Sequence, residues 1–362
     1  MTGVDILSID KIFVINPGST STKIALYREA LCLWTKTINH STKDLKQFHR
    51  IIDQFGFRKK AIESTVISDG YALEDFKAIV ARGGLLKPIS GGTYLVNEKM
   101  LLDLKGCTYG EHASNLGALI ADEIAKPLGI NAYIVDPVVV DELEPLARLS
   151  GTPEVPRRSI FHALNQKAMA RRYCSDTNTN YESVNLLIVH LGGGISVGAH
   201  KKGRVVDVTN ALDGEGPFSP ERVGGVPVIE LLKYLVAESS DFKSMRKRLI
   251  GQGGLAAYLQ TNDARKVEVM IEKKNEKAKL VYEAMAYQIA KEIGAYATVL
   301  SGDVDAIILT GGLAHSRRLT SWIKERVEFL APVSIYPGED EMLALAEGAL
   351  RVVDGVEKHL VY

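Results

Sequence analysis

Residues 12–27 decide the fold, and they read Ile-Phe-Val-Ile-Asn-Pro-Gly-Ser-Thr-Ser-Thr-Lys-Ile-Ala-Leu-Tyr. Two apolar runs, 12–15 and 24–27, flank a polar turn, and this pattern predicts two strands joined as a β-hairpin. The turn from Asn16 to Lys23 carries hydroxyl side chains, a glycine and a lysine. Hydroxyls, backbone N–H groups and an ammonium suit a small anion, and phosphate fits best. The sequence therefore predicts a phosphate loop on a hairpin.

Two common phosphate-binding motifs do not occur in the sequence. The P-loop signature Gly-x-x-x-x-Gly-Lys-Ser/Thr is absent, and no complete Gly-x-Gly-x-x-Gly is present. A P-loop nucleoside triphosphatase and a Rossmann dinucleotide site are therefore set aside.

A second hairpin of the same design is predicted at residues 187–200, which read Leu-Ile-Val-His-Leu-Gly-Gly-Gly-Ile-Ser-Val-Gly-Ala-His. An apolar run again enters a glycine-rich turn and returns as a strand. Two such hairpins facing each other can hold a polyphosphate from both sides. For either hairpin alone, an ordinary glycine turn without a ligand is an open alternative.

Length and composition predict a two-domain globular protein. The chain has 362 residues, and 46% hydrophobic with 24% charged residues is ordinary for folded domains. Lys plus Arg and Asp plus Glu number 44 each, so no net charge attracts nucleic acid or an anionic membrane. Apolar stretches fall short of the roughly 20 residues that span a bilayer, and Met1–Asp5 has no leader pattern. We expect a cytoplasmic protein that binds small molecules or other protein chains.

Cysteine usage and proline spacing refine this expectation. Cys32, Cys107 and Cys174 are odd in number and widely spaced, so neither disulfides nor zinc is expected. Pro153–Arg158 has two prolines in four residues and is interpreted as the hinge between domains of residues 1–150 and 151–341. A helix is predicted over Asp44–Ile52. Buried strands are predicted at 78–81, 131–136 and 305–310, the last preceded by a helix over 281–300.

The residues that follow these strands, together with the first loop, carry a resemblance to a known family. The ordered set is Asn16–Lys23, Arg82, Asp136, His162, His190, Gly311–Ser316 and Gly338–Met342. It resembles the acetate and butyrate kinase family of the actin, Hsp70 and sugar-kinase superfamily, over nearly the whole chain. The chain is more similar to the butyrate kinases, because it is shorter than acetate kinases and has Gln166 where they carry a second histidine.

The resemblance implies two actin-like (ribonuclease H-like) α/β domains around a nucleotide cleft, with a C-terminal helix, about 342–362, packing back on the first domain. It implies Mg²⁺ (or Mn²⁺) with ATP/ADP, and in-line transfer of phosphate from ATP to a short-chain carboxylate, most closely butyrate or isobutyrate. It also implies a homodimer, formed through the second domain, or a higher homo-oligomer.

Roles for individual residues follow from the same resemblance. Arg82 and Arg222 would hold the carboxylate or the transferring phosphate, for which the planar guanidinium is suited. His162 and His190 would donate to phosphoryl oxygens, and Asp136 would act near the metal. Each has an ordinary alternative, a surface arginine or a structural histidine.

Nucleotide, metal and substrate contacts complete the implied site. Phosphate and nucleotide contacts are Asn16, Ser19, Ser21, Lys23, Gly192, Gly193, Gly194, Asp263, Ala264, Arg265, Gly311, Gly312 and Leu313. The implied metal contacts are Asn16 and Glu341. The acidic run 339–341 can instead complement a helix N-terminus. His112 and Asn115 resemble the acyl pocket, with helix capping by Ser114 and Asn115 as the alternative.

Two other functions remain open from the sequence. One is a related kinase acting on acetate, propionate or a sugar. The other is a non-catalytic ATP-binding protein of actin type.

Overall fold

The computed structural model describes residues 11–238 and 241–362, so Met1–Asp5, on which the leader expectation rests, lies outside the described residues. The chain forms two compact units, one of residues Met1–Val140 with Asp340–Tyr362 and one of Asp141–Glu339. The chain thus leaves the first unit at Val140, earlier than the expected boundary near residue 150. The two units are described separately below.

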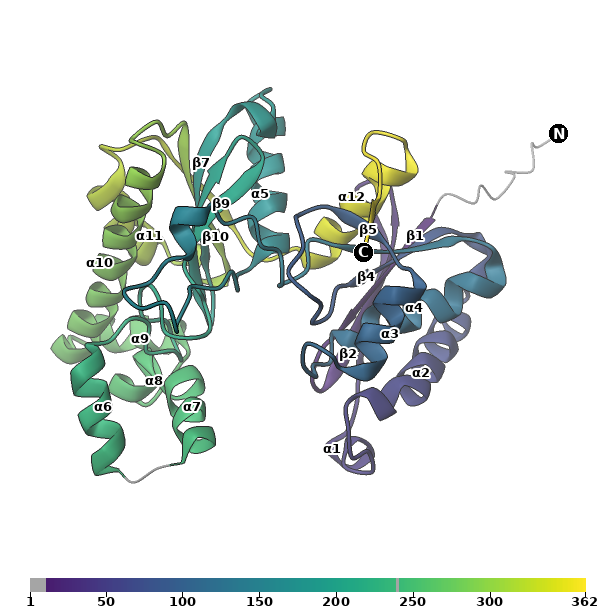
Figure 1. Cartoon of the computed structure of the whole chain (residues 1–362), viewed down its shortest axis with the longest axis horizontal. Coiled ribbons are helices and arrows are strands. Elements are labelled where there is room, and N and C mark those ends of the chain that lie inside the picture. Colours follow the sequence, from purple (N-terminus) through teal and green to yellow (C-terminus); the bar gives the residue numbers. More distant parts are fainter. Residues whose placement is uncertain (1–10, 239–240) are drawn as a thin grey trace. The chain divides into compact units, whose positions relative to one another are not determined.

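The first unit is built on a seven-stranded sheet with the strand order β12-β5-β6-β4-β1-β2-β3 (Figure 1). Its strands are β1 (Lys11–Pro17), β2 (Ser21–Arg28), β3 (Leu31–Asn39), β4 (Phe76–Arg82), β5 (Thr93–Leu95), β6 (Asn131–Val135) and β12 (Leu360–Val361). The predicted hairpin is confirmed, because β1 pairs antiparallel with β2 in the register Val14 to Ala25. On its other side β1 pairs in parallel with β4.

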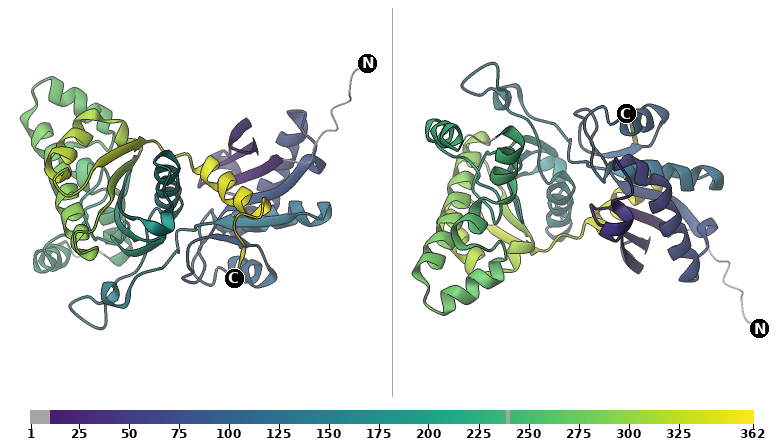
Figure 2. Two further views of the ribbon diagram at one scale, coloured as in Figure 1. Left: turned by 90° about the horizontal axis from the view of Figure 1, so that it is seen from above. Right: turned by 90° about the horizontal axis from the view of Figure 1, so that it is seen from below.

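Helices cover both faces of this sheet. The helices of this unit are α1 (Thr42–Leu45), α2 (Phe55–Ser68), α3 (Glu98–Gly106), α4 (Asn115–Leu128) and α12 (Glu341–Val353). Ile134 packs in the cluster that contains the apolar face of α4, whereas Gly348 of α12 approaches its neighbour Val135. Successive strand residues point to opposite faces, so α4 and α12 enclose the sheet between them (Figure 2). The helix predicted over Asp44–Ile52 is wrong, since a turn separates α1 from α2.

The second unit repeats this plan with a five-stranded sheet in the order β11-β10-β7-β8-β9. Its strands are β7 (Asn185–Leu191), β8 (Ile195–Lys201), β9 (Arg204–Val208), β10 (Ala306–Gly311) and β11 (Val333–Pro337). The central strand β7 pairs antiparallel with β8 and in parallel with β10, as β1 does with β2 and β4. The second predicted hairpin is therefore confirmed as well, and so is its structural correspondence to the first.

The helices of the second unit are α5 (Ala163–Asp176), α6 (Val228–Ala237), α7 (Phe242–Gly251), α8 (Gly254–Leu259), α9 (Ala264–Glu272), α10 (Glu276–Val299) and α11 (Arg317–Val327). Alternating β7 residues face different helices. Leu187 and Val189 pack in the core that α10 and α11 supply, whereas Leu186 and Ile188 pack against α5. Helices on both faces of a buried sheet make each unit an α/β domain.

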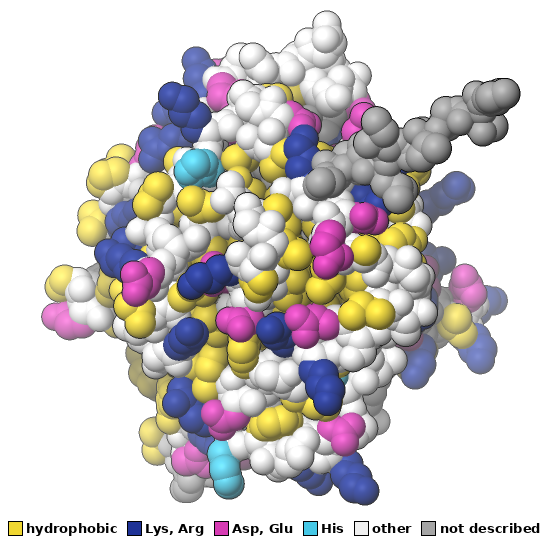
Figure 3. Space-filling view, turned by 90° about the vertical axis from the view of Figure 1, so that its right-hand side faces the viewer, with side chains coloured by type: hydrophobic (Ala, Val, Ile, Leu, Met, Phe, Trp, Pro, Cys, Tyr) yellow, Lys and Arg dark blue, Asp and Glu magenta, His cyan; other side chains and the backbone are white. Residues whose placement is uncertain are grey.

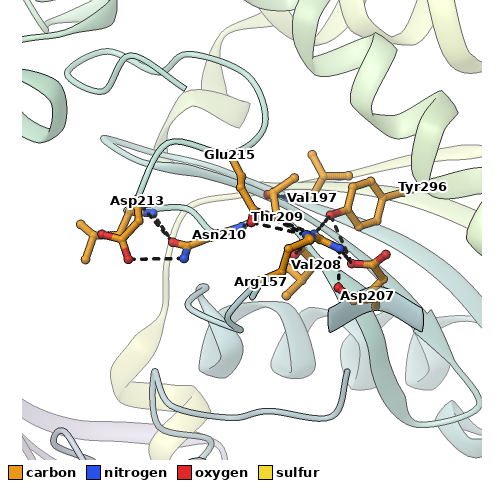
Figure 4. Close-up of polar contacts among 11 residues, drawn as sticks. Arg157, Val197, Asp207, Val208, Thr209, Asn210, Asp213, Glu215 and Tyr296 are labelled. Atoms are coloured by element: carbon orange, nitrogen blue, oxygen red, sulfur yellow. Dashed lines mark hydrogen bonds and ion pairs between the residues drawn. The ribbon is translucent and has the colours of Figure 1, made fainter. Parts of the chain in front are cut away.

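The segment expected to be a hinge lies inside the second unit. Arg157 donates to Asp207 Oδ1 at 2.9 Å, to the carbonyl oxygen of Val208 at 3.0 Å and to Glu215 Oε2 at 3.1 Å (Figure 4). It also donates to the Tyr296 hydroxyl at 3.0 Å. The prolines prevent regular structure here, but the arginine fixes the segment to the unit.

Surface charge and hydropathy agree with the composition. Figure 3 shows acidic and basic side chains interspersed on the face that it presents. Among the described residues, no helix combines the length and hydropathy needed to cross a bilayer.

Candidate functional site

The loop between β1 and β2 is organised around a buried arginine that the sequence analysis did not select. Arg58 of α2 has no exposed surface. It donates to the carbonyl oxygens of Gly18 (2.7 Å), Ser19 (2.9 Å) and Ser21 (3.1 Å). Its remaining donors reach Gln54 Oε1 at 2.8 and 3.0 Å. A guanidinium has five N–H donors, so one side chain gathers three loop carbonyls on one side.

This arrangement decides what the loop offers to a ligand. The Thr20 carbonyl accepts from the His40 N–H at 2.8 Å, so it too has an internal partner. In the described part of the chain, no hydrogen bond uses the N–H groups of Ser19 and Thr20. Loop carbonyls are thus held inward while loop N–H groups stay available, which is the polarity that an anion requires.

His40 completes the support beneath the loop. Its Nε2 lies 2.9 Å from Thr22 Oγ1, which also accepts from Arg58 Nη1 at 3.2 Å. Burial, and secondarily the Arg58 charge, lower the pKa of His40 to about 4. The neutral imidazole therefore accepts from the Thr22 hydroxyl at neutral pH.

Three predicted site residues from distant parts of the chain meet in the first unit. Glu341 Oε2 accepts from Asn16 Nδ2 and from Arg82 Nη1, both at 2.8 Å. Asn16 ends the apolar run of β1, Arg82 ends β4, and Glu341 lies in the first turn of α12. The Arg82 and Glu341 side chains are 38% and 26% exposed, so the group can reach a ligand.

The three acidic residues at positions 339–341 have different hydrogen-bond partners. Asp340 caps α12, its Oδ1 accepting from the Leu343 N–H at 3.1 Å. Glu339 belongs to the second unit, where its Oε1 lies 3.1 Å from His190 Nε2. Only Glu341 joins the Asn16 and Arg82 group. The alternative role of the acidic run, at a helix N-terminus, therefore applies to Asp340.

The remaining predicted residues of the first loop lie on its outer side. Lys23 of β2 pairs with Asn16 in the hairpin register. Lys23 and Ser19 are exposed, and Ser21 is half-buried. These side chains therefore flank the same loop whose N–H groups are unused.

Asp136, His112 and Asn115 occupy a second part of the first unit. Asp136 directly follows β6, is buried, and accepts from the Gly92 N–H at 2.7 Å. Its φ of 37° places it in the left-handed region, which is uncommon for a residue with a side chain. Burial, and then the nearby Arg82 charge, lower the pKa of His112. Asn115 is buried and bridges the Leu85 N–H and the Gly110 carbonyl at 2.8 and 2.9 Å.

The capping alternative at α4 is not realised through a side-chain bond. Ser114 occupies the position before the helix without capping it, and its hydroxyl lies 2.8 Å from His112 Nδ1.

In the second unit the two predicted histidines lie face to face. The rings of His162 and His190 stack with centroids 3.7 Å apart and planes 11° from parallel. His162 directly precedes α5, and His190 is on β7 beside the glycine turn. His190 Nδ1 lies 2.7 Å from Asn165 Oδ1. Asn165 was missed because nothing in its local sequence marks it.

The turn Gly192–Gly194 is crowded by functional side chains. A Cβ at Gly192 would lie 2.8 Å from His190 Nε2, and one at Gly193 would lie 2.6 Å from Glu221 Oε1. A Cβ at Gly194 would overlap the Arg222 guanidinium. A side chain at any of these positions would displace the end of His190, Glu221 or Arg222, so the glycines allow these three side chains to lie against the turn.

Arg222 is held directly against this turn. Its Nη1 donates to the Ala211 carbonyl, and its N–H donates to Ser219 Oγ at 3.1 Å. Ser219 Oγ in turn donates to the Gly193 carbonyl at 2.5 Å. Burial lowers the pKa of the Arg222 guanidinium. Its Nε atom is buried without a protein partner, so the side chain retains a donor.

The residues predicted to contact the nucleotide lie in two parts of the second unit, the turn after β10 and the start of α9. Gly311, at φ 91°, exchanges backbone hydrogen bonds with Gly338 at 3.2 and 3.0 Å. A short 3-10 helix (Gly312–His315) follows, and the α-helix begins only at Arg317. Asp263 caps α9, accepting from the Arg265 N–H at 3.0 Å, and pairs with the exposed Arg265 side chain. Ala264 is the first residue of α9.

The donor set of the first unit suits a hard cation. Mg²⁺ takes one or two carboxylates together with waters and substrate phosphates. Glu341 supplies a carboxylate, and Asn16 keeps its amide oxygen while its Nδ2 bonds to Glu341. In the described residues no three His, Cys, Asp or Glu side chains cluster as a metal cage. The arrangement therefore fits a cation that shares its ligands with a nucleotide.

Comparison with known proteins identifies the family. A model of the acetokinase family matches residues 153–331. Over 352 residues the chain is 52% identical to butyrate kinase 2 of Clostridium acetobutylicum, covering 97% of this chain and 99% of that protein. The chain belongs to the acetate and butyrate kinase family.

Solved structures extend this result to the fold. Acetate kinase of Porphyromonas gingivalis matches with a TM-score of 0.76 at 19% identity, over 94% of this chain and 99% of that one. Propionate kinase of Francisella tularensis matches with a TM-score of 0.74 at 18% identity, over 94% and 98%. The two actin-like domains expected for the acetate and butyrate kinase family are thereby confirmed.

Proposed function

We propose that the chain catalyses the reversible phosphorylation of a short-chain carboxylate by ATP, with butyrate or isobutyrate as the preferred acid. The observation that carries this proposal is the 52% identity to a butyrate kinase over 97% of the chain. The hydrogen bonds from Asn16 and Arg82 to Glu341 support it, because they bring polar residues of three different elements together.

The reaction needs no protein nucleophile. A carboxylate oxygen attacks the γ-phosphorus, a new P–O bond forms, and the bond to the bridging oxygen of ADP breaks in line with it. The products are an acyl phosphate and ADP. Catalysis then depends on positioning and on stabilising charge on the equatorial oxygens.

The first unit holds the acceptor and part of the phosphate. Arg82 binds the carboxylate or the transferring group, with Glu341 fixing its guanidinium at 2.8 Å. His112 and Asn115 belong to the acyl side, and Asp136 lies near the attacking oxygen. Ser19, Ser21 and Lys23 present donors to phosphate from the hairpin loop. Glu341 and Asn16 would hold Mg²⁺, which would supply positive charge to neutralise the phosphates.

The second unit supplies the nucleotide contacts and further donors. His162 and His190 donate to phosphoryl oxygens, and Arg222 contributes its remaining donor beside the glycine turn. The Gly192, Gly193 and Gly194 backbone lies against phosphate. Adenosine lies against the Gly311–Leu313 turn and Asp263–Arg265.

A substrate panel tests this function. Acetate, propionate, butyrate and isobutyrate are incubated with MgATP, and the acyl phosphate is trapped as a hydroxamate. Each additional buried CH₂ contributes about 0.8 kcal/mol, so kcat/KM should rise at least tenfold from acetate to butyrate and fall for longer acids. Preference for acetate or a sugar would support a related kinase instead. Nucleotide binding without any product would support a non-catalytic actin-type protein.

We also propose that the protein is cytoplasmic and forms a homodimer or a higher homo-oligomer, as the resemblance implies. Light scattering coupled to size-exclusion chromatography gives the mass of the assembly, and a monomer mass would contradict this part of the proposal.

A further inference from the structure

A continuous chain of polar side chains leads from His162 into the interior of the second unit. The contacts run from His162 Nδ1 to Ser196 Oγ (3.0 Å) and from Ser196 Oγ to Gln166 Nε2 (2.8 Å). They continue from Gln166 Oε1 to His200 Nε2 (2.9 Å) and from His200 Nδ1 to the Tyr181 hydroxyl (2.7 Å). Ser196, Gln166 and His200 have no exposed surface, so these groups can bond only to one another and to nearby protein.

A backbone carbonyl fixes the direction of the whole chain. Gln166 Nε2 lies 3.2 Å from the carbonyl oxygen of Ser196, which can only accept. The amide nitrogen of Gln166 must therefore face Ser196, and its oxygen must face His200. Gly198 leaves the room for this orientation, because a Cβ there would lie 2.5 Å from Gln166 Oε1.

The orientation of Gln166 determines the tautomer of His200. Since Gln166 Oε1 can only accept, His200 Nε2 carries a proton. Complete burial, and secondarily the charges of Lys167 and Arg171, lower the pKa of His200 well below its ordinary value. The ring is therefore neutral, and its Nδ1 accepts from the Tyr181 hydroxyl.

On the other side of Gln166, the proton of the Ser196 hydroxyl has one described acceptor. Ser196 Oγ accepts from Gln166 Nε2, and its own hydrogen can be donated to His162 Nδ1. If His162 Nδ1 were the donor instead, the buried Ser196 hydroxyl hydrogen would lack a partner, which is unfavourable. The remaining ring proton of neutral His162 is therefore on Nε2.

We propose that Gln166 is a positioning residue that acts through Ser196 to hold His162 as the Nε2–H tautomer, so that this imidazole donates to the phosphoryl group. The inference rests on the proposed function, since it explains how His162 is prepared as a donor.

The tautomer can be observed directly in the unmodified protein. Imidazole ¹⁵N resonances distinguish Nδ1–H from Nε2–H, and the chain has eight histidines. The His162 signals are assigned as those lost in His162→Gln. We expect the Nε2–H form, and an Nδ1–H form in the wild-type protein would overturn the inference.

Replacing Gln166 by glutamate, which has the same shape but carries a charge, should move the ring proton of His162 from Nε2 to Nδ1. In Gln166→Glu at pH 9 the carboxylate can only accept, so the Ser196 hydroxyl turns toward it and Ser196 Oγ accepts from His162 Nδ1–H. Gln166→Met, which has no donor and only a weak thioether acceptor, should give a mixture of the two forms. Persistence of pure Nε2–H in both variants would contradict the inference.

Kinetics supply the second measurement. Losing a donor to the phosphoryl group lowers kcat roughly 100-fold, so Gln166→Glu should lose about that factor with KM for ATP changed less than threefold. Thr320→Val, which removes a buried hydroxyl from α11, is the matched control and should retain kcat. Equal losses in kcat and nucleotide binding would indicate a structural role for Gln166. If the wild-type protein forms no acyl phosphate, the proposed function fails while the ¹⁵N measurement still tests the tautomer.

Discussion

Arg58 Nη1 lies 2.7 Å from the carbonyl oxygen of Gly18, so a buried cation supports the loop that is proposed to bind phosphate. The charge has no exposed surface, and therefore acts on a ligand through the backbone that it orients. Arg58 thus belongs to the site although it offers no surface to a ligand.

Arg58→Lys should weaken nucleotide binding and stability together. An ammonium has three donors in place of the five of the guanidinium fork, so at least one loop carbonyl loses its partner. Each unsatisfied buried group costs about 1–3 kcal/mol. We expect the free energy of unfolding to fall by about that amount and ATP affinity to fall about tenfold, measured by urea unfolding and calorimetry.

The neighbouring residue provides the control for Arg58. Among the described residues, Lys59 pairs with Glu63 and Glu123 at 3.6 and 3.5 Å, and both ion pairs are partly exposed. Such pairs contribute about 0–1 kcal/mol, so Lys59→Met should leave ATP affinity unchanged. Wild-type ATP affinity in a destabilised Arg58→Lys protein would restrict Arg58 to a structural role.

Arg82→Ala should separate binding from chemistry. Its guanidinium is proposed to act on the acyl or transferring group, so phosphoryl transfer should fall at least 1000-fold while ATP affinity changes little. Arg82→Lys should recover little of the activity, because a lysine lacks the planar fork. Single-turnover acyl phosphate formation and ATP titration measure the two properties. Turnover near the wild-type value in Arg82→Ala would remove Arg82 from the site.

The low pKa of His40 predicts a pH-dependent stability. Protonation occurs near pH 6.5 in the unfolded chain but only near pH 4 in the folded one, so the unfolded state binds more protons between these values. Stability is therefore complete above about pH 7 and declines as the pH falls through 6.5 toward 4, by up to about 3 kcal/mol.

Urea unfolding at several pH values tests this dependence. His40→Gln keeps a polar partner for Thr22 but cannot titrate, so the loss of stability between pH 7 and pH 4.5 should be smaller than in the wild-type protein. His49→Gln, at an exposed position, is the control. Identical pH profiles for wild type and His40→Gln would show that His40 does not account for the effect.

Metal dependence should follow from the oxygen donors near Glu341. Activity should be lost with EDTA and restored by Mg²⁺ or Mn²⁺, because a hard cation arrives with the nucleotide. Glu341→Gln should raise the Mg²⁺ concentration needed for half-maximal activity, whereas Asp340→Asn, which alters the α12 cap, should not. Stoichiometric zinc in the purified protein, measured by mass spectrometry, would contradict this prediction.

Local sequence patterns predicted both hairpins, but they did not predict every helix or the contacts between distant segments. Both hairpins could be predicted because strand alternation and turn chemistry are encoded within about fifteen residues. Pro153–Arg158 was correctly read as irregular, but its place in the fold depends on Arg157 reaching Asp207 and Glu215, which the local sequence does not reveal. The helix predicted over Asp44–Ile52 failed because the same apolar spacing also occurs in turns.

For the candidate site, the sequence allowed a proposal for the residues that contact ligands but not for the buried residues that hold them in place. Asn16, Arg82 and Glu341 were selected by resemblance, and the structure brings them within hydrogen-bonding distance. Arg58, Asn165 and Ser196 were missed because their importance comes from buried partners on other elements. Arg58 in particular lies beside two lysines, where a charged residue is typical of a solvated helix face.

The division of the chain has a consequence for synthesis on the ribosome. The second unit is continuous, so it can fold once Glu339 has emerged. The first unit needs α12, which packs on β1, β4 and β6, and β12, which pairs with β5. One edge and one face of its sheet therefore stay uncovered until residues 340–362 are translated. During that time the incomplete first domain is accessible to chaperones.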